Sequence, residues 1–382
     1  MVRVLTQGLK IVTLLTVTIL AISGAIWFFD YWHDRELAGE NGRPVVVQIS
    51  GEDDSGTVAD KLTDGDLINF GFYFEARMRF ADVELQPGTY TLRTGMSVPE
   101  IMDTITIEAS LGEEENVAGS VGEPIEVTFI EGHRAEEFGA TLEAAGIPNG
   151  QQEFMEAVND PSIRASFDFL DDVPDDASIN GFLFPDTYTI PADSTAADVV
   201  YYMLETFDTR VTSEDRAEFD AQGLSLYEAI TVASIVEREA AVAEERPIIA
   251  AAYLNRIEQD MLLNADPTIQ YAVGTPNEWW PTLTNANLEL DSPYNTYLYE
   301  GLPPSPISNP GLASIQAVGA PADVSYLYFV AKQDGSGEHA FAGTYEEHQR
   351  NVCTYNPEGC ADASIPAGLA SQSPVDTRHR VT

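Results

Sequence analysis

Basic residues are scarce in this chain of 382 residues. It carries 19 lysines and arginines against 62 aspartates and glutamates, which gives a formal net charge of −43. Its only lysines are Lys10, Lys61 and Lys332. A surface this acidic repels nucleic acid and anionic lipid headgroups, so it argues against any function that depends on phosphate contacts. We therefore expect no nucleic-acid partner.

Cysteine is almost absent as well. Cys353 and Cys360 are the only two, and no Cys-x-x-Cys pair or Cys/His ligand pattern occurs in the chain. The absence of such a pattern argues against a structural zinc site, and we predict no metal. In an oxidising compartment the two cysteines could close a short loop as a disulfide. Their spacing alone leaves two free thiols equally open.

One long run near the N-terminus lacks charge. Ile11–Phe29 is 19 residues long and has no charged side chain, which suffices for one helix across a bilayer core of about 30 Å. Arg3 and Lys10 precede the run and acidic residues follow it, so the positive-inside rule puts residues 1–10 in the cytoplasm. We predict a transmembrane helix at residues 11–30. A cleaved signal peptide is the alternative, but the run is long and bulky Trp27–Phe29 replace a small-residue cleavage site.

The rest of the chain has the composition of a globular protein. Apolar residues make up 44% of it, and its length allows two domains. Residues 43–120 predict a small α+β module, because short valine-rich and turn-bounded strands alternate with helical spacing. Residues 121–360 predict a second, mixed α/β domain. Residues 361–382 predict a disordered tail.

A helix that carries glutamates stands at the centre of the second domain. Ser225 followed by Glu228 is a capping-box pattern that starts it. The helical period places Glu237 in a stripe of apolar and small residues and Glu239 nearly opposite. Desolvation by such neighbours would raise the pKa of the Glu237 carboxyl, so that it could act as a general acid near neutral pH. Alternatively, Glu237 is solvated or paired with Arg238 or Arg246.

A second stretch has the composition of a carbohydrate-binding surface. Residues 293–311 combine tyrosines, amides and several prolines. Aromatic faces stack on sugar rings and amides hydrogen-bond hydroxyl groups. A rigid structural loop with buried tyrosines would have the same composition.

Several segments, taken in order, resemble the YceG-like endolytic murein transglycosylases. They are NGFLFPDTY at 180–188, SIVEREAAVAEER at 234–246, NRI at 255–257, ADPTIQYA at 265–272, SPYNTY at 292–297, GLPPSPISNPG at 301–311 and YLYFVA at 326–331. The resemblance implies an α+β protein with a single N-terminal transmembrane helix and a LysM-like α+β module. It further implies a C-terminal mixed α/β catalytic domain built around the glutamate-bearing helix.

The resemblance also implies an activity and a location. The enzyme would cut the MurNAc–GlcNAc β-1,4 bond inside nascent peptidoglycan strands, leave 1,6-anhydro-MurNAc ends and thereby terminate strand elongation. Glu237 matches the catalytic glutamate of the family, and no cofactor is needed because the nucleophile is the C6 hydroxyl of the substrate. The protein would be single-pass in the bacterial inner membrane, with the catalytic domain outside the cytoplasm. Peptidoglycan synthases or division proteins are the expected protein partners.

The same segments supply candidates for the sugar cleft. These substrate-binding candidates are Asn255, Asp266, Thr268, Gln270, Tyr294, Asn295, Thr296 and Tyr297. Two other functions fit the pattern less well: a non-catalytic wall-binding scaffold, and a hydrolase of the lysozyme type. The hydrolase requires a second carboxylate about 5–9 Å from the first. Glu239 is poorly placed for that role, whereas Glu244 and Glu245 stay open.

Overall fold

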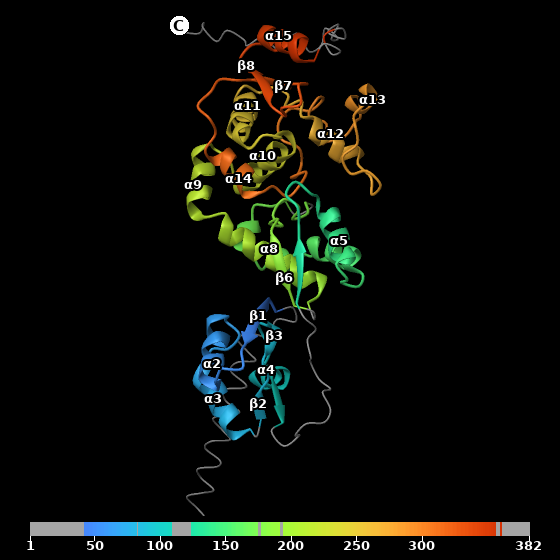
Figure 1. The fold of residues 1–382 in the computed structure, drawn as a ribbon. Helices are drawn as coiled ribbons and strands as arrows, with labels where there is room; N and C mark the ends of the chain where they lie inside the picture. The colour runs from blue at the N-terminus through green and yellow to red at the C-terminus, as the bar shows by residue number, and fades with distance from the viewer. Residues whose placement is uncertain are drawn as a thin grey trace, which may run out of the picture. The chain divides into compact units, whose positions relative to one another are not determined.

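The computed structural model describes residues 42–81, 83–108, 124–174, 177–191, 194–356 and residue 360 (Figure 1). The predicted transmembrane helix at 11–30 and the predicted tail at 361–382 lie outside these residues. Within the described ranges, no helix is both long enough and apolar enough to cross a membrane. The chain forms two compact units, one from Met1–Glu126 with Thr189–Asp198 and one from Val127–Tyr188 with Val199–Thr382.

The N-terminal unit is a small α+β module. Its elements are β1 (Pro44–Ile49), α2 (Ser55–Asp64), α3 (Gly71–Phe80), β2 (Val83–Leu85), β3 (Gly88–Arg93), α4 (Val98–Ile105) and β4 (Thr106–Glu108). β1 pairs antiparallel with β3, and β2 pairs antiparallel with β4. Leu62, Phe74, Leu92 and Ile101 are completely buried and form the centre of its core. This confirms the α+β class predicted for this part of the chain.

The sequence patterns missed one helix in this unit. α3 has no side-chain N-cap, because Phe70 stands at that position, and so no local start signal announces it. Helix α4 ends at Ile105, since Thr106–Glu108 pairs with β2. Pairing with a strand distant in the sequence decides such boundaries, which local propensity cannot do.

Helices dominate the rest of the chain. The elements are β5 (Ile125–Thr128), α5 (Ala135–Ala144), α6 (Gly150–Val158), α7 (Pro161–Arg164), η1 (Asp168–Leu170), β6 (Thr187–Ile190), α8 (Ala196–Arg210), α9 (Ser213–Ala221), α10 (Leu226–Glu239), η2 (Ala243–Glu245), α11 (Arg246–Glu258), α12 (Asp266–Val273), α13 (Asn285–Leu288), α14 (Leu312–Gly319), β7 (Tyr328–Ala331), β8 (His339–Ala342) and α15 (Tyr345–Tyr355). The described strands form only two-stranded sheets, β5 with β6 and β7 with β8. The expected mixed α/β domain is therefore corrected to a helical domain with small sheets at its edges.

Helix α10 is the central helix of this domain and lies among α11, α12 and α14 (Figure 1). Its N-terminus is the predicted capping box: the amide of Glu228 donates to Ser225 Oγ at 3.2 Å, and the amide of Ser225 donates to Glu228 Oε2 at 2.9 Å. Every residue from Ala229 to Val236 is buried. The helix is thus surrounded by protein, so one apolar stripe does not describe its environment.

The fold decides the state of the two cysteines. Cys353 and Cys360 form a disulfide at the end of α15, which decides between the two states left open by their spacing.

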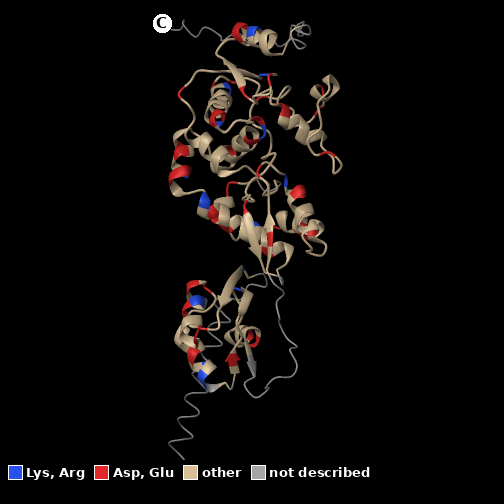
Figure 2. Ribbon diagram, viewed as in Figure 1, with Lys and Arg blue, Asp and Glu red and all other residues tan. Residues whose placement is uncertain are grey.

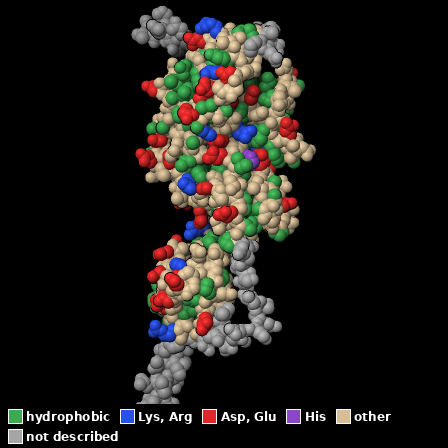
Figure 3. All heavy atoms as spheres, viewed as in Figure 1, with side chains coloured by type: hydrophobic (Ala, Val, Ile, Leu, Met, Phe, Trp, Pro, Cys, Tyr) green, Lys and Arg blue, Asp and Glu red, His purple; other side chains and the backbone are tan. Residues whose placement is uncertain are grey.

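Acidic side chains are spread over both units (Figure 2) and along the face seen in Figure 3, without gathering into one patch. This distribution fits a solvated surface rather than an acidic binding site.

Candidate active site

Glu237 lies in the last turn of α10, and its side chain is only 8% exposed. Three donors surround its carboxylate. Oε2 accepts the backbone N–H of Gly311 at 3.2 Å and the hydroxyl of Ser314 at 2.6 Å. Arg246 Nη2 lies 3.5 Å from Oε1. A solvated Glu237 is therefore excluded, whereas the pairing with Arg246 is present.

These donors come from the starts of two other helices. Gly311 is the N-cap residue of α14, Ser314 lies in the first turn of that helix, and Arg246 opens α11. A helix N-terminus presents free N–H groups and the positive end of its dipole, which favours a carboxylate there. The carboxyl oxygens of Glu237 thus meet polar groups, and this corrects the apolar surroundings expected from the helical projection.

Ser314 is held in one orientation. The Nε–H of Arg246 donates to Ser314 Oγ at 3.0 Å. A guanidinium can only donate, so Oγ must accept this bond, and its own hydrogen is left to be donated to Glu237. Ser314 is completely buried, so no water competes for these bonds. The chain of bonds therefore fixes the position of the Glu237 carboxyl.

The neighbouring Arg238 does not pair with Glu237. Its guanidinium lies 3.8 Å from the ring centroid of Trp280, and its Nη1 donates to the carbonyl of Gly132 at 3.4 Å. Burial lowers the pKa of Arg238, while the charges of Glu137 and Glu237 oppose that shift. Arg238 thus ties the segment around Trp280 to the loop after β5.

That loop brings a second carboxyl group to the site. The amide of Gly132 donates to the carbonyl of Asn309 at 2.8 Å, and the amide of Asn309 donates back to the carbonyl of His133 at 2.8 Å. The carboxyl of Glu131 then lies against Gly311, where a Cβ atom would come within 2.1 Å of Glu131 Oε1. Burial raises the pKa of Glu131 and the charge of Glu237 adds to the rise, whereas Arg246 opposes it.

Two asparagines, Asn180 and Asn309, join two of the quoted sequence segments around this loop. Asn309 Oδ1 accepts the amides of Gly181 and Leu183 at 2.7 and 3.2 Å. Its Nδ2 donates to His133 O and to Asn180 Oδ1 at 3.1 and 3.2 Å. Both asparagines are buried. The segments at 180–188 and 301–311 therefore support the active-site loops from inside the protein.

Glu239, placed by the helical period nearly opposite Glu237, is the more desolvated of the two carboxyls. The hydroxyl of Tyr253 in α11 donates to Glu239 Oε1 at 2.6 Å. Burial raises the pKa of Glu239 to about 7, partly offset by the Tyr253 hydrogen bond. The desolvation that the helical projection assigned to Glu237 thus acts on Glu239, because α11 covers this side of α10.

Three of the cleft candidates lie inside the protein. Thr268, Asn295 and Thr296 are buried. Asn295 Nδ2 donates to the carbonyls of Leu288 and Leu290 at 3.0 and 2.7 Å. Thr296 Oγ1 accepts the amide of Ala265 and lies 3.0 Å from Thr268 Oγ1. In this conformation these side chains set the shape of the loops.

The other five candidates also bond to protein groups. Asn255 Nδ2 donates to the carbonyls of residues 324 and 326, and Gln270 Nε2 donates to the carbonyl of residue 281. The hydroxyl of Tyr294 shares a hydrogen bond with the hydroxyl of residue 305. The hydroxyl of Tyr297 donates to the carboxyl of Asp266. Among the hydrogen bonds and ion pairs of the described residues, none joins these side chains to Glu237. In this conformation their polar groups bond to other parts of the protein rather than to Glu237.

The residues that do contact Glu237 were partly missed by the sequence patterns. Arg246 and Gly311 are the last residues of two of the segments quoted above, whereas Ser314 lies just beyond one of them. Glu131 was not among the candidate site residues. Of the carboxylates left open for a hydrolase, Glu244 is exposed. Glu245 accepts the ring nitrogen of His339 at 2.7 Å and its amide at 2.9 Å.

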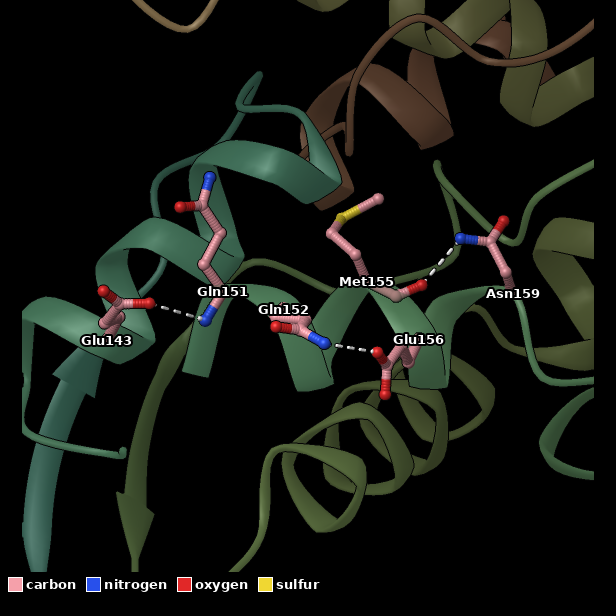
Figure 4. A pocket seen from close by; sticks show the side chains of 6 residues that line it. All are labelled: Glu143, Gln151, Gln152, Met155, Glu156 and Asn159. Carbon is pink, nitrogen blue, oxygen red and sulfur yellow. Dashed lines mark hydrogen bonds between the residues drawn. The ribbon is translucent and has the colours of Figure 1, made fainter. Parts of the chain in front are cut away.

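A shallow hollow on α5 and α6 does not belong to this site (Figure 4). It is lined by Glu143, Gln151, Gln152, Met155, Glu156 and Asn159. Its polar groups bond to one another, for example Gln152 Nε2 to Glu156 Oε1 at 2.8 Å and the amide of Gln151 to Glu143 Oε2 at 3.3 Å. Few polar groups are left to converge on a ligand there.

The protein resembles known proteins over most of its length. The YceG-like family matches residues 47–354. An endolytic murein transglycosylase from Bacillus subtilis is 28% identical over 317 residues, covering 80% of this chain and 83% of that protein. One from Streptococcus pneumoniae strain D39 is 25% identical over 369 residues, covering 90% of this chain and 65% of that protein.

A solved structure agrees with these matches. The crystal structure of a YceG-like protein from Listeria monocytogenes has a TM-score of 0.53 and 29% sequence identity, covering 81% of this chain and 99% of that one. The family match alone extends over well more than half of the chain and includes the whole Glu237 site. The resemblance seen in the sequence is confirmed, and the protein belongs to the YceG-like family.

Proposed function

We propose that the protein is an endolytic lytic transglycosylase of peptidoglycan, which cleaves the MurNAc–GlcNAc β-1,4 bond and leaves 1,6-anhydro-MurNAc ends. The observation that carries this proposal is the position of Glu237, whose carboxyl is held by Gly311, Ser314 and Arg246. The relatives named endolytic murein transglycosylase support the same activity.

The geometry suits a carboxyl group that gives up a proton and takes it back. In the first step Glu237 protonates the glycosidic oxygen, and the bond to C1 of MurNAc breaks. The three donors around Glu237 then stabilise the carboxylate that forms, without having to reorganise. In the second step this carboxylate accepts the proton of the C6 hydroxyl as that oxygen attacks C1. The proton count of Glu237 is restored, and no water is consumed.

The location and partners of the enzyme form part of the proposal. A helix at residues 11–30 would anchor the protein in the inner membrane, with the rest of the chain outside the cytoplasm. The uncharged run with its basic flank supports this orientation, and the Cys353–Cys360 disulfide is typical of an oxidising compartment. The N-terminal unit would bind glycan as a LysM-like module, and peptidoglycan synthases or division proteins would be its neighbours.

The test is the chemistry of the product ends. Full-length protein in detergent is incubated with uncrosslinked glycan strands, and the new ends are identified by mass spectrometry. New 1,6-anhydro-MurNAc ends, formed by cleavage within long strands, support the proposal. Reducing ends would indicate a hydrolase, and uncut strands a binding protein, and either result would overturn it.

Replacement of Glu237 tests whether its carboxyl is the general acid. We expect Glu237→Gln to fold normally and to lose roughly 10²–10⁴-fold in kcat, since an amide keeps the shape but cannot donate the proton. Glu239→Gln is the matched control, because it makes the same change two residues away in the same helix. Near-normal turnover by Glu237→Gln, or an equal loss in both variants, would remove Glu237 from this role.

A further inference from the structure

We propose that Glu131 is a positioning residue of this active site, whose carboxyl lies beside that of Glu237 and opposes ionisation of the acid. The proposal rests on the transglycosylase function proposed above and adds a second acidic residue to it. Glu131 is 106 positions away from Glu237 in the sequence, and it reaches the site through the loop between β5 and α5.

Both carboxyl groups meet at the same glycine. The N–H of Gly311 donates to Glu237 Oε2 at 3.2 Å. On the same residue, the position of a Cβ would lie 2.1 Å from Glu131 Oε1. Standard backbone dimensions then place the two carboxyl groups within roughly 8 Å of each other. Two negative charges at this separation repel each other appreciably in a partly desolvated site.

The charges around the pair do not balance if both carboxyls are ionised. Glu237 and Arg238 face the loop from α10 and Arg246 from α11, while His133 Nε2 lies 3.9 Å from Glu137 Oε1 beside it. The start of α14 contributes only uncharged groups. Arg238 lies over Trp280, so Arg246 is the one cation within reach of both carboxyl groups, among the described residues. One proton on the pair relieves the remaining repulsion, as in other paired carboxylates.

A purely structural role for Glu131 has little support. The described hydrogen bonds and ion pairs include none from its carboxylate, and the residue remains accessible to solvent. Burial and the charge of Glu237 both raise the pKa of Glu131. A carboxyl placed against another carboxyl without a hydrogen-bond partner costs stability, and such arrangements are concentrated in active sites.

The second carboxyl compensates for the donors around Glu237. A general acid must start protonated, but an N–H, a hydroxyl and a guanidinium all favour its charged form. The negative charge of Glu131 offsets that of Arg246 and so opposes ionisation of the acid. Glu131 neither gains nor loses a proton over the reaction, because Glu237 gives its proton to the glycosidic oxygen and recovers one from the C6 hydroxyl.

The test is the pH profile of kcat/KM for full-length Glu131→Gln on uncrosslinked glycan strands. We expect the alkaline limb to move to lower pH by roughly 0.5–1 unit, since the like charge is removed at a site open to solvent. At pH 8 this is a loss of about three- to tenfold, with activity recovered near pH 5. High salt should reduce the difference. Glu126→Gln, the same change on the exposed surface of β5, is the control and should keep the wild-type profile.

A second variant reaches the same pair without removing the charge. Gly311→Ala places a methyl group where the Glu131 carboxyl lies, and that flexible side chain can swing away. Gly311 has a φ of −74°, so alanine is not strained there. We expect the alkaline limb of its kcat/KM profile to move to lower pH, as for Glu131→Gln. This variant decides the matter if Glu131→Gln does not fold.

Two results would overturn the proposal: a profile of Glu131→Gln that superposes on the wild type, or a loss that is uniform across pH. The titration of Glu131, followed by carboxyl ¹³C NMR, gives a readout that does not depend on activity. We expect its pKa to fall in Glu237→Gln, and an unchanged titration would also refute the pairing. If the wild type makes reducing ends or cuts nothing, the proposed function fails while this titration still reports on the pair.

Discussion

The raised pKa of Glu239 predicts how the stability of the protein depends on pH. In the folded protein, burial raises the pKa of this carboxyl from 4.5 to about 7. The folded state therefore binds this proton more tightly than the unfolded chain does. The free energy of unfolding that Glu239 contributes is highest below pH 4.5, falls as the pH rises from 4.5 to 7, and is lowest above pH 7.

The magnitude follows from the size of the shift. One pKa unit corresponds to about 1.4 kcal/mol, so the ionised carboxyl costs up to about 3 kcal/mol above pH 7. Glu239→Gln removes this cost, because the amide cannot ionise and its oxygen can still accept the hydroxyl of Tyr253. We expect this variant to be more stable than the wild type by about 1–3 kcal/mol at pH 8 and nearly equal to it at pH 4.5.

Thermal unfolding of the two proteins at pH 4.5 and pH 8 measures this difference. For a domain of this size the gain at pH 8 corresponds to a Tm higher by roughly 2–10 °C. Glu258→Gln, at an exposed position near the end of α11, is the matched control and should show no such dependence. An equal effect of Glu239→Gln at both pH values would show that folding does not shift the pKa of Glu239, and the reasoning would be wrong.

Two other substitutions test the scaffold of the active site. Ser314→Ala leaves Arg246 Nε without its acceptor and Glu237 with one hydrogen bond fewer, so kcat should fall about tenfold in a folded protein; an unchanged kcat would mean that Ser314 does not orient the acid. Asn309→Ala breaks buried bonds to Asn180 and to three backbone groups. It should lower the free energy of unfolding by about 2–4 kcal/mol, measured in denaturant, and a loss below 1 kcal/mol would contradict that role.

The family and the central helix followed from the residues alone, and Glu237 as the catalytic carboxyl stays a prediction. Ser225 and Glu228 start α10 through bonds that reach only three positions along the chain. The ordered segments between 180 and 331 identified the family. Signals of this kind depend on near neighbours in the chain or on the order of the segments, and neither requires knowledge of the packing.

Packing between distant segments decided the rest. Glu237 and Glu239 lie two positions apart in α10. It is α11 that decides which of the two is desolvated, because its Tyr253 covers Glu239. The donors to Glu237 come from the starts of α11 and α14, and Glu131 arrives from a loop more than a hundred residues earlier. Burial and hydrogen-bond partners are properties of what surrounds a side chain in space. Helical spacing placed Glu237 on one face of its helix, but only the tertiary structure determined what that face meets.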